Sequence, residues 1–308
     1  MSVSLAFCVL LAAVDGAAPV DAYDTSVSVP IVLDGSTERA TPTAAAAPIA
    51  ATPTAATAPT ATTPTAPIAI AGVTTHEPVV ALTFDACATK KQANGFDRKV
   101  FEILAREQTP ATFYLSGRWV EKHPSAARAI AAAPWIELGN HTYSHPRLTL
   151  TRKERIHLQI RRTSKIIEKK IGRPALTLRP PAGAFNAAVV EIANQEHLPV
   201  VLWSIVSGDV GGHVPVERMD RTVLEQAKPG SIIIFHINKR APFTKKALPD
   251  IIAGLREKGF HFVTVSQLLA LPDAVPIKAK PSRGYRPRNK PHPAEPTTPG
   301  EDHADPPT

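Results

Sequence analysis

The sequence predicts an α/β fold, a distorted (β/α) barrel of about seven parallel strands. Seven short apolar runs recur within Pro78–Leu271, and amphipathic segments of helical period separate most neighbouring runs. The runs are nearly continuous in Val, Ile and Leu, which indicates strands that are covered on both faces. Because repeated right-handed crossovers close such a sheet on itself, a barrel is expected. The predicted strands are Val79–Phe84, Ala111–Leu115, Ile136–Gly139, Ala175–Leu178, Pro199–Ile205, Ser231–Phe235 and His261–Val265.

Pro78–Leu271 is expected to be the one folded domain of the 308 residues, because Pro and Ala concentrate outside it. Upstream, residues 23–77 include a long Ala/Thr/Pro cycle with almost no charge, and they are expected to form a disordered linker. Downstream, residues 272–308 are first basic, then acidic and Pro-rich, and they are expected to form a disordered tail.

The first 22 residues are typical of a signal peptide. Their apolar run, Ser2–Val14, is shorter than the ~20 residues that a spanning helix needs, and small residues follow it. A secreted or periplasmic protein without a transmembrane span is therefore expected. No Lys or Arg precedes the run, so a buried N-terminal helix or a wrongly chosen start remains an alternative.

Two cysteines occur in the chain, Cys8 inside the predicted signal peptide and Cys87 in the domain. An exported chain would keep Cys87 alone, which excludes an internal disulfide. Because cysteine is usually a small buried residue, Cys87 is interpreted as a packing residue, with metal contact as the alternative.

The predicted domain is basic. Residues 78–277 contain 28 Lys and Arg against 17 Asp and Glu, a net charge of +11, which favours anionic partners. Nine of these basic residues lie between Thr151 and Arg173, on and beside a predicted helix Thr151–Gly172 whose inward stripe is Ile156, Ile160, Ile167 and Ile171. The helix face is either simply solvated or holds an acidic glycan or an anionic cell-wall polymer. No nucleic acid partner is expected, because the chain carries an export signal and no recognisable binding motif.

Polar residues follow five of the predicted strands. The carboxyl ends of parallel barrel strands meet at one rim, where barrel enzymes carry their active sites. A rim that offers carboxylates, imidazoles and a guanidinium has the groups for metal binding, a base and an acid. The residues are Asp85, His141, His145, Arg179, Asp209 and His236.

The runs LTFDA, GNHTYSH, LRPPAG, WSIVSGD and IIFHI, in this order, resemble the five motifs of the NodB-homology polysaccharide deacetylases, carbohydrate esterase family 4. The resemblance spans residues 79–269 and implies a NodB-like barrel. It also implies metal-dependent hydrolysis of acetyl groups, N-acetyl before O-acetyl, from a glycan such as peptidoglycan, a chitin-like oligomer or an exopolysaccharide. The runner-up interpretation is a catalytically inactive relative that binds glycan or cell wall.

The histidine pair is the expected metal site. His141 and His145 are four residues apart where a strand becomes a loop, so both imidazoles can reach one divalent ion, with zinc expected. The resemblance makes Asp85 the general base, and Arg179 would keep that carboxylate ionised.

His236 matches the general acid of the family, and Asp209 is placed to orient its imidazole and favour the charged form. The resemblance further implies that the Ala182 backbone N–H stabilises the oxyanion, and that Ile234 and Trp203 wall a small pocket for the acetyl methyl group.

Three positions depart from the family pattern, and the first motif is divergent. The family usually has a second Asp, a metal ligand, where this chain has Ala86. Asp97, beyond a Gly-containing loop, is the candidate replacement; its alternative role is the N-cap of a helix Arg98–Arg106. Ala182 stands where the family generally has Tyr, and Val210 where Trp is common, so the sugar-binding surface is expected to differ.

Overall fold

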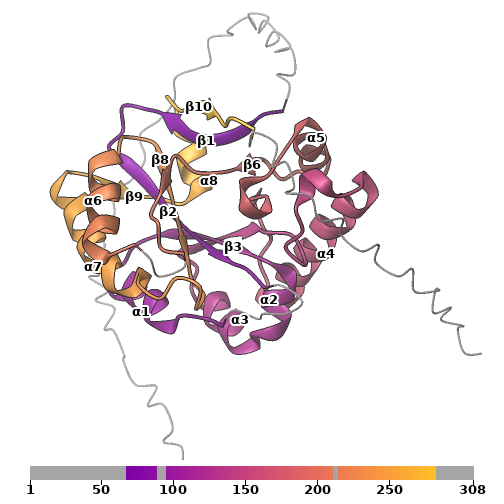
Figure 1. Cartoon of the computed structure of the whole chain (residues 1–308), viewed down its shortest axis with the longest axis horizontal. Helices are drawn as coiled ribbons and strands as arrows, with labels where there is room; N and C mark the ends of the chain where they lie inside the picture. Colours follow the sequence, from indigo (N-terminus) through magenta and orange to yellow (C-terminus); the bar gives the residue numbers. More distant parts are fainter. Residues whose placement is uncertain (1–66, 89–94, 211–213, 282–308) are drawn as a thin grey trace, which may run out of the picture. The chain divides into compact units, whose positions relative to one another are not determined.

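The α/β barrel predicted from the sequence is confirmed by a computed structural model, which describes residues 67–88, 95–210 and 214–281. Seven strands form a closed ring in the order β1-β6-β5-β4-β3-β2-β8, with β8 returning to β1 (Figure 1). All neighbours in the ring are parallel except β1 and β8, which meet antiparallel at Gly72 and Ser231, so the barrel is mixed. Its strands are β1 (Ala69–Thr74), β2 (Val79–Ala86), β3 (Ala111–Leu115), β4 (Ile136–Asn140), β5 (Thr177–Leu178), β6 (Val200–Val201) and β8 (Ser231–His236).

Three further strands extend the sheet outside the ring. The strand β7 (Ile205–Val206) pairs with β8, β9 (His261–Phe262) pairs with β2, and β10 (Val275–Lys278) pairs antiparallel with β1. The predicted strand Pro199–Ile205 is therefore two short strands, and His261–Val265 does not belong to the ring.

The strand that closes the barrel is β1, which lies in residues expected to be linker. The expectation of a disordered linker is therefore wrong for residues 69–74, and that of a disordered tail is wrong for residues 275–278. The apolar stretch of β1 was hidden by the Ala and Pro around it, and its strand character comes from pairing with β6, β8 and β10. The predicted signal peptide, residues 23–66 of the linker and residues 282–308 of the tail lie outside the described residues.

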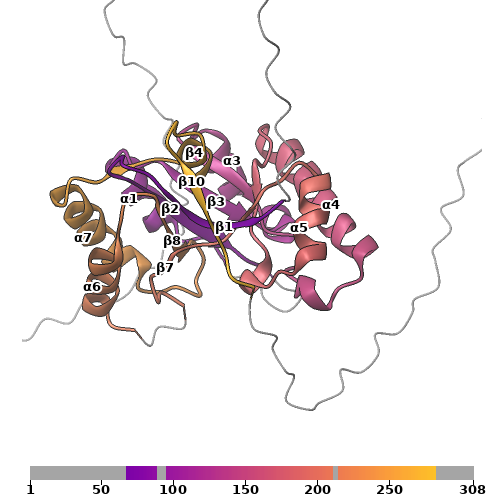
Figure 2. The same cartoon turned by 90° about the horizontal axis from the view of Figure 1, so that it is seen from above.

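Helices surround the barrel on its outer side (Figures 1 and 2). The longest is α4 (Lys153–Ile171), whose predicted inward stripe of four isoleucines is buried and which ends at Gly172 in the left-handed conformation (φ 82°). None of the helices in the described part of the chain is long and apolar enough to cross a membrane. The others are α1 (Arg98–Arg106), α2 (Gly117–Lys122), α3 (Pro124–Ala131), α5 (Ala187–Gln195), α6 (Val216–Gln226), α7 (Thr244–Glu257) and α8 (Val265–Leu269), with 3₁₀ turns at Leu148–Leu150 and Pro181–Gly183.

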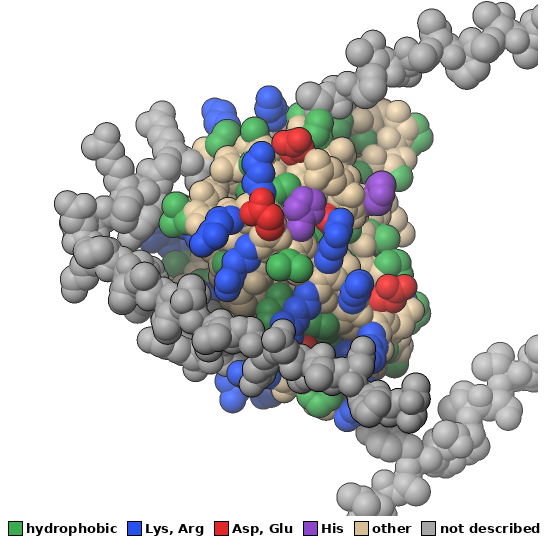
Figure 3. Space-filling model, turned by 90° about the vertical axis from the view of Figure 1, so that its right-hand side faces the viewer, with side chains coloured by type: hydrophobic (Ala, Val, Ile, Leu, Met, Phe, Trp, Pro, Cys, Tyr) green, Lys and Arg blue, Asp and Glu red, His purple; other side chains and the backbone are tan. Residues whose placement is uncertain are grey.

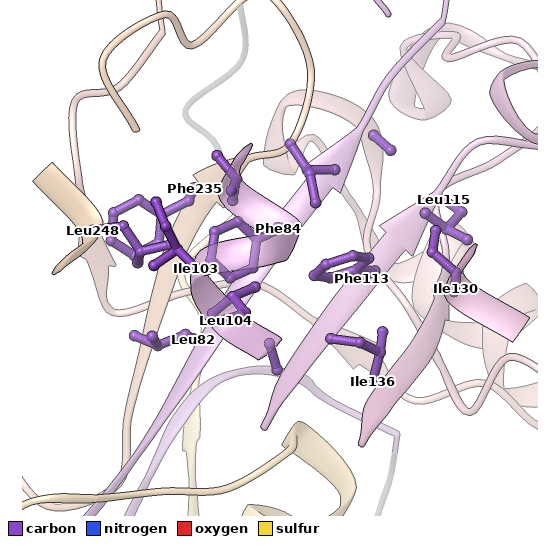
Figure 4. Close-up of a cluster of buried hydrophobic side chains, with 14 of the residues drawn as sticks. Leu82, Phe84, Ile103, Leu104, Phe113, Leu115, Ile130, Ile136, Phe235 and Leu248 are labelled. Atoms are coloured by element: carbon purple, nitrogen blue, oxygen red, sulfur yellow. The ribbon is translucent and has the colours of Figure 1, made fainter. Parts of the chain in front are cut away.

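The main hydrophobic core fills the layer between the barrel and helices α1, α3 and α7 (Figure 4). Phe84 lies at its centre, stacked on Phe235 at 5.4 Å between ring centroids and edge-on to Phe113 at 5.5 Å. Every second residue of β2 belongs to this core, among them Leu82, Phe84 and Ala86. The residues between them, Thr83 and Asp85, therefore face the barrel interior.

Candidate active site

A cavity of about 430 Å³ lies at the carboxyl ends of the barrel strands. It collects most of the polar residues singled out in the sequence, which come from β2, β8 and the loops after β4 and β7. Its lining is Asp85, Cys87, His141, His145, Ala182, Trp203, Val206, Gly208, Asp209, Val210, Val214, Ile234, His236 and Arg240. A larger hollow of about 660 Å³ beside β1 and β10 contains Glu225 and Lys228 as its charged residues and no such cluster.

Asp85 and Arg179 form a buried ion pair at the floor of this cavity. The Arg179 Nη1 atom donates to Asp85 Oδ1 at 2.9 Å. The Arg179 side chain is 0% exposed and that of Asp85 is 5% exposed. Burial alone would raise the pKa of Asp85, but the positive charge of Arg179, helped by His141 and His236, holds that pKa below its usual value. Asp85 is therefore ionised at neutral pH, as a general base requires.

Arg179 is itself fixed by the barrel interior. Its guanidinium donates to the hydroxyl of Thr83 at 2.9 Å and to the carbonyl oxygens of Val201 and Leu202 at 3.3 and 2.8 Å. It also lies over the ring of Tyr114, with 3.9 Å between the guanidinium carbon and the ring centroid. The charge that holds Asp85 ionised is thus locked in one position.

His236 and Asp209 form the second charged pair. Asp209 Oδ1 lies 3.0 Å from His236 Nδ1, and Asp209 Oδ2 accepts from the backbone N–H of His236 at 2.6 Å and from the hydroxyl of Thr244 at 2.9 Å. Burial would lower the pKa of His236, but the hydrogen bond and charge of Asp209 raise it above the usual value. Nδ1–H then points at Asp209 and leaves Nε2 to act as an acid.

Asp85 and His236, the predicted base and acid, lie side by side. Asp85 and His236 are register partners on the parallel strands β2 and β8, so both emerge at the same level of the rim. A carboxylate held ionised thus lies beside an imidazole whose protonated form Asp209 favours, which is the division of roles that acid–base catalysis at one site needs.

The histidine pair converges because the backbone turns sharply between its members. Thr142 and His145 adopt left-handed backbone conformations (φ 61° and 59°), which residues other than glycine rarely adopt. The ring centroids of His141 and His145 lie 5.0 Å apart. Burial lowers the pKa of both imidazoles, that of His145 to about 3, so both are neutral at pH 7, the form in which histidine binds metals.

His141 is oriented by its neighbour. Its Nδ1–H donates to the carbonyl oxygen of Arg179 at 2.7 Å, which leaves the lone pair on Nε2. Among the residues that the structure describes, no atom hydrogen-bonds this buried Nε2; the nearest charged atom is Asp85 Oδ2 at 3.6 Å. A buried nitrogen lone pair without a donor fits a metal cation.

Within the described ranges, one group of side chains could hold a metal ion, and it consists of Cys87, His141 and His145. Their ligand atoms all lie within 4.8 Å of one another. The prediction of Asp97 as a ligand is not supported: its carboxylate caps α1 by accepting from the Lys99 N–H at 3.2 Å and pairs with Lys245 Nζ at 3.2 Å. The helix-cap alternative is the one that the structure shows.

Cys87 belongs to this site, although the sequence favoured packing for it and left metal contact as the alternative. The interpretation as a packing residue is right about its burial, but the side chain also lines the cavity. The alternation along β2 contained the signal, because residues 85 and 87 are two apart and so share a face.

The three residues predicted around the substrate acetyl group, Ala182, Ile234 and Trp203, all line the cavity. Ala182 has a positive φ of 55° within the 3₁₀ turn Pro181–Gly183. Its role as oxyanion donor remains a prediction.

The chain is similar in sequence to known polysaccharide deacetylases. Residues 72–201 match the family model described as polysaccharide deacetylase. The chain is 32% identical over 191 residues to a peptidoglycan-N-acetylglucosamine deacetylase of Bacillus cereus, covering 61% of this chain and 67% of that one. It is also 32% identical over 176 residues to the uncharacterized protein YlxY of Bacillus subtilis, covering 57% of this chain and about half (54%) of YlxY.

Among solved structures, a wild-type carbohydrate esterase family 4 pseudoenzyme from Bacillus anthracis superposes with a TM-score of 0.60. The two are 27% identical, and the superposition covers 66% of this chain and 69% of the pseudoenzyme. Active and inactive proteins thus share the fold. By sequence, by barrel topology and by the arrangement of its rim, the chain belongs to the polysaccharide deacetylase family.

Proposed function

We propose that the chain is a secreted or periplasmic, metal-dependent deacetylase that hydrolyses acetyl groups, N-acetyl above all, of a glycan. Peptidoglycan, a chitin-like oligomer and an exopolysaccharide are the substrate classes considered. The observation that carries the proposal is the pairing of a base and an acid in one cavity: Arg179 holds Asp85 ionised, while Asp209 holds His236 protonated. The apolar N-terminal run supports export.

The site fits a divalent metal, zinc by preference, because neutral His141 and His145 offer nitrogen lone pairs at its centre. A bound zinc ion supplies Lewis-acid polarisation of the acetyl carbonyl and makes water more acidic. Asp85 accepts the proton of the attacking water, and His236 donates a proton to the leaving nitrogen. The backbone N–H of Ala182, a residue that lines the cavity, would stabilise the charge that develops on the carbonyl oxygen.

The alternative is an inactive glycan-binding relative, and a pseudoenzyme of the family is among the similar structures. The missing carboxylate at Ala86 favours this alternative. The two buried charged pairs favour the enzyme, because burying an ion pair is costly and binding a neutral sugar needs neither a base nor an acid.

Acetate release decides between the two. The purified, zinc-loaded chain is incubated with N-acetylated and O-acetylated glycans, and free acetate is measured, with His141→Ala as the matched inactive control. Acetate release from at least one glycan by the wild type alone supports the enzyme. If none is released while the protein sediments with insoluble peptidoglycan, the binding relative is the better description.

We further propose an anionic cell-wall polymer as a partner of helix α4. A groove of about 540 Å³ is lined by Arg161, Arg162, Lys165, Lys169 and Lys170, with Glu121 at its edge. The face on that side of the molecule shows many Lys and Arg side chains and few acidic ones (Figure 3). Polymer binding should weaken steeply with salt and should fall on changing the three lysines to Gln. Salt-independent binding would favour a merely solvated helix face.

A further inference from the structure

The inner face of β2 continues beyond the catalytic base. Ala86 and Ala88 both belong to the outer hydrophobic core, whereas Asp85 and Cys87 line the cavity. A carboxylate is absent at position 86, and the methyl group there faces away from the histidines. The side chain that does reach them from this strand is the thiol of Cys87.

The distances suit a metal. Zinc bonds of about 2.3 Å to sulfur and about 2.0 Å to nitrogen place tetrahedral ligand atoms roughly 3.5 Å apart. The ligand atoms of Cys87, His141 and His145 lie within 4.8 Å of one another, so small side-chain rotations are enough to close the set. The buried Nε2 lone pair of His141 points to the same ion independently of the cysteine.

We propose that Cys87 is the third protein ligand, so that this chain holds its metal with one thiolate and two imidazoles in place of the carboxylate the family usually uses. The inference rests on the proposed function for the presence of a metal and adds the identity of the missing ligand. On binding, the Cys87 thiol loses its proton to solvent as the sulfur–metal bond forms. Three ligands leave the fourth position open, as in other catalytic zinc sites.

The surroundings of Cys87 match a sulfur ligand. Burial and the Asp85 charge raise the pKa of the Cys87 thiol, so the thiolate forms only together with the bond to the metal. Arg240 hydrogen-bonds the thiol, and this positive donor would complement the thiolate charge. The backbone carbonyl of Cys87 accepts from Asn238 Nδ2 at 3.3 Å, which ties the residue to the loop after β8. A soft sulfur ligand also selects zinc over magnesium, calcium or manganese, which prefer oxygen.

Cobalt(II) is the probe that reports the ligand directly. The whole chain is stripped of metal with a chelator and titrated with Co²⁺, and absorption is recorded for wild type, Cys87→Ser and the matched control Cys8→Ser. We expect a near-ultraviolet thiolate-to-cobalt band in the wild type and in Cys8→Ser, and its loss in Cys87→Ser. Wild-type cobalt protein without that band would overturn the proposal, and this outcome needs no variant to fold.

Zinc affinity gives the second measurement. Competition against a chromophoric chelator should show zinc binding at least about 100-fold weaker in Cys87→Ser than in Cys8→Ser, because loss of a direct ligand costs more than loss of a supporting contact. Equal zinc affinity would reject Cys87 as a ligand. If Cys87→Ser binds zinc as tightly as the wild type and still releases acetate, the proposed deacetylase is supported and Cys87 is rejected as a ligand. If the wild type shows the cobalt–thiolate band but releases no acetate, Cys87 is supported as a ligand and the proposed deacetylase is rejected.

Discussion

Replacing Arg179 by Met should destabilise the fold strongly and in a pH-dependent way. Methionine keeps much of the apolar stem but removes the guanidinium, which makes four hydrogen bonds inside the barrel. The change leaves the Asp85 carboxylate buried without its cationic partner. It also leaves two main-chain carbonyls, those of Val201 and Leu202, without their Arg179 donor.

The expected magnitude follows from these contacts. Removing one partner of a buried ion pair costs about 3–5 kcal/mol. Each unsatisfied buried carbonyl adds about 1–3 kcal/mol where water does not reach it. A loss of at least about 4 kcal/mol in the free energy of unfolding is therefore expected, which is a large part of the roughly 5–15 kcal/mol that folded domains have. The melting temperature should fall by about 10 °C.

The pH dependence identifies the cause. In the wild type the pKa of Asp85 is lowered, so the stability that it contributes is present above the ordinary carboxyl pKa and is lost as the pH falls. Without Arg179, burial dominates and raises that pKa, so the ionised carboxylate costs stability at pH 7, and protonation relieves the cost. The stability difference between wild type and variant should therefore shrink towards pH 4.

Urea unfolding followed by far-ultraviolet circular dichroism at pH 7 and at about pH 4.5 measures both effects. Asp85→Asn in the Arg179→Met background should recover part of the loss, because the stranded charge is gone. The reasoning would be refuted by a loss below about 1 kcal/mol at pH 7, or by a double variant that is no more stable than Arg179→Met alone.

Three further predictions concern the site. Asp85→Asn should keep the bound zinc in the folded protein but lower its stability, because buried Arg179 loses its partner, and should lower kcat by about 10²–10⁴-fold, measured by acetate release; an unchanged rate would exclude Asp85 as the base. Asp209→Asn should lower the pKa of His236, so the basic limb of the kcat/KM profile should move to lower pH; a fixed limb would mean that another group is the acid. Asp97→Asn should leave zinc content normal and destabilise by about 1 kcal/mol or less through loss of the Lys245 pair, and reduced zinc content would reinstate Asp97 as a ligand.

The fold was predictable from the sequence where strands are long and buried on both faces. The predicted runs at β2, β3 and β8 match the observed strands to within two residues. These runs are apolar, and a strand that is covered on both faces buries all of their side chains. β1 was not predictable from its own residues: the run AIAGVT follows an Ala/Thr/Pro stretch of similar composition. Its structure is set by partners more than 130 residues away.

The site was predictable where a motif fixed a residue's place at a strand end, as for Asp85, Arg179 and His236. The third metal ligand was not predictable, because separation along the sequence is a poor guide to which residues line the same cavity. Asp97 is the next carboxylate along the chain, but a helix N-terminus competes for its side chain. Cys87 was interpreted first as a packing residue because cysteine is usually buried, although its position two residues after Asp85 gave it the correct face.

The closure of the barrel by β1 also bears on how the chain folds. β1 precedes the other ring strands in the chain, yet its ring partners β6 and β8 come late, so the ring can form only after nearly all of the domain exists. Such long-range pairing makes folding slow. Because the base, the acid and Arg179 stand on strands that closure brings together, no shorter intermediate can hold the complete site. Acetate release should therefore emerge in the same refolding phase as native tertiary structure, not before it.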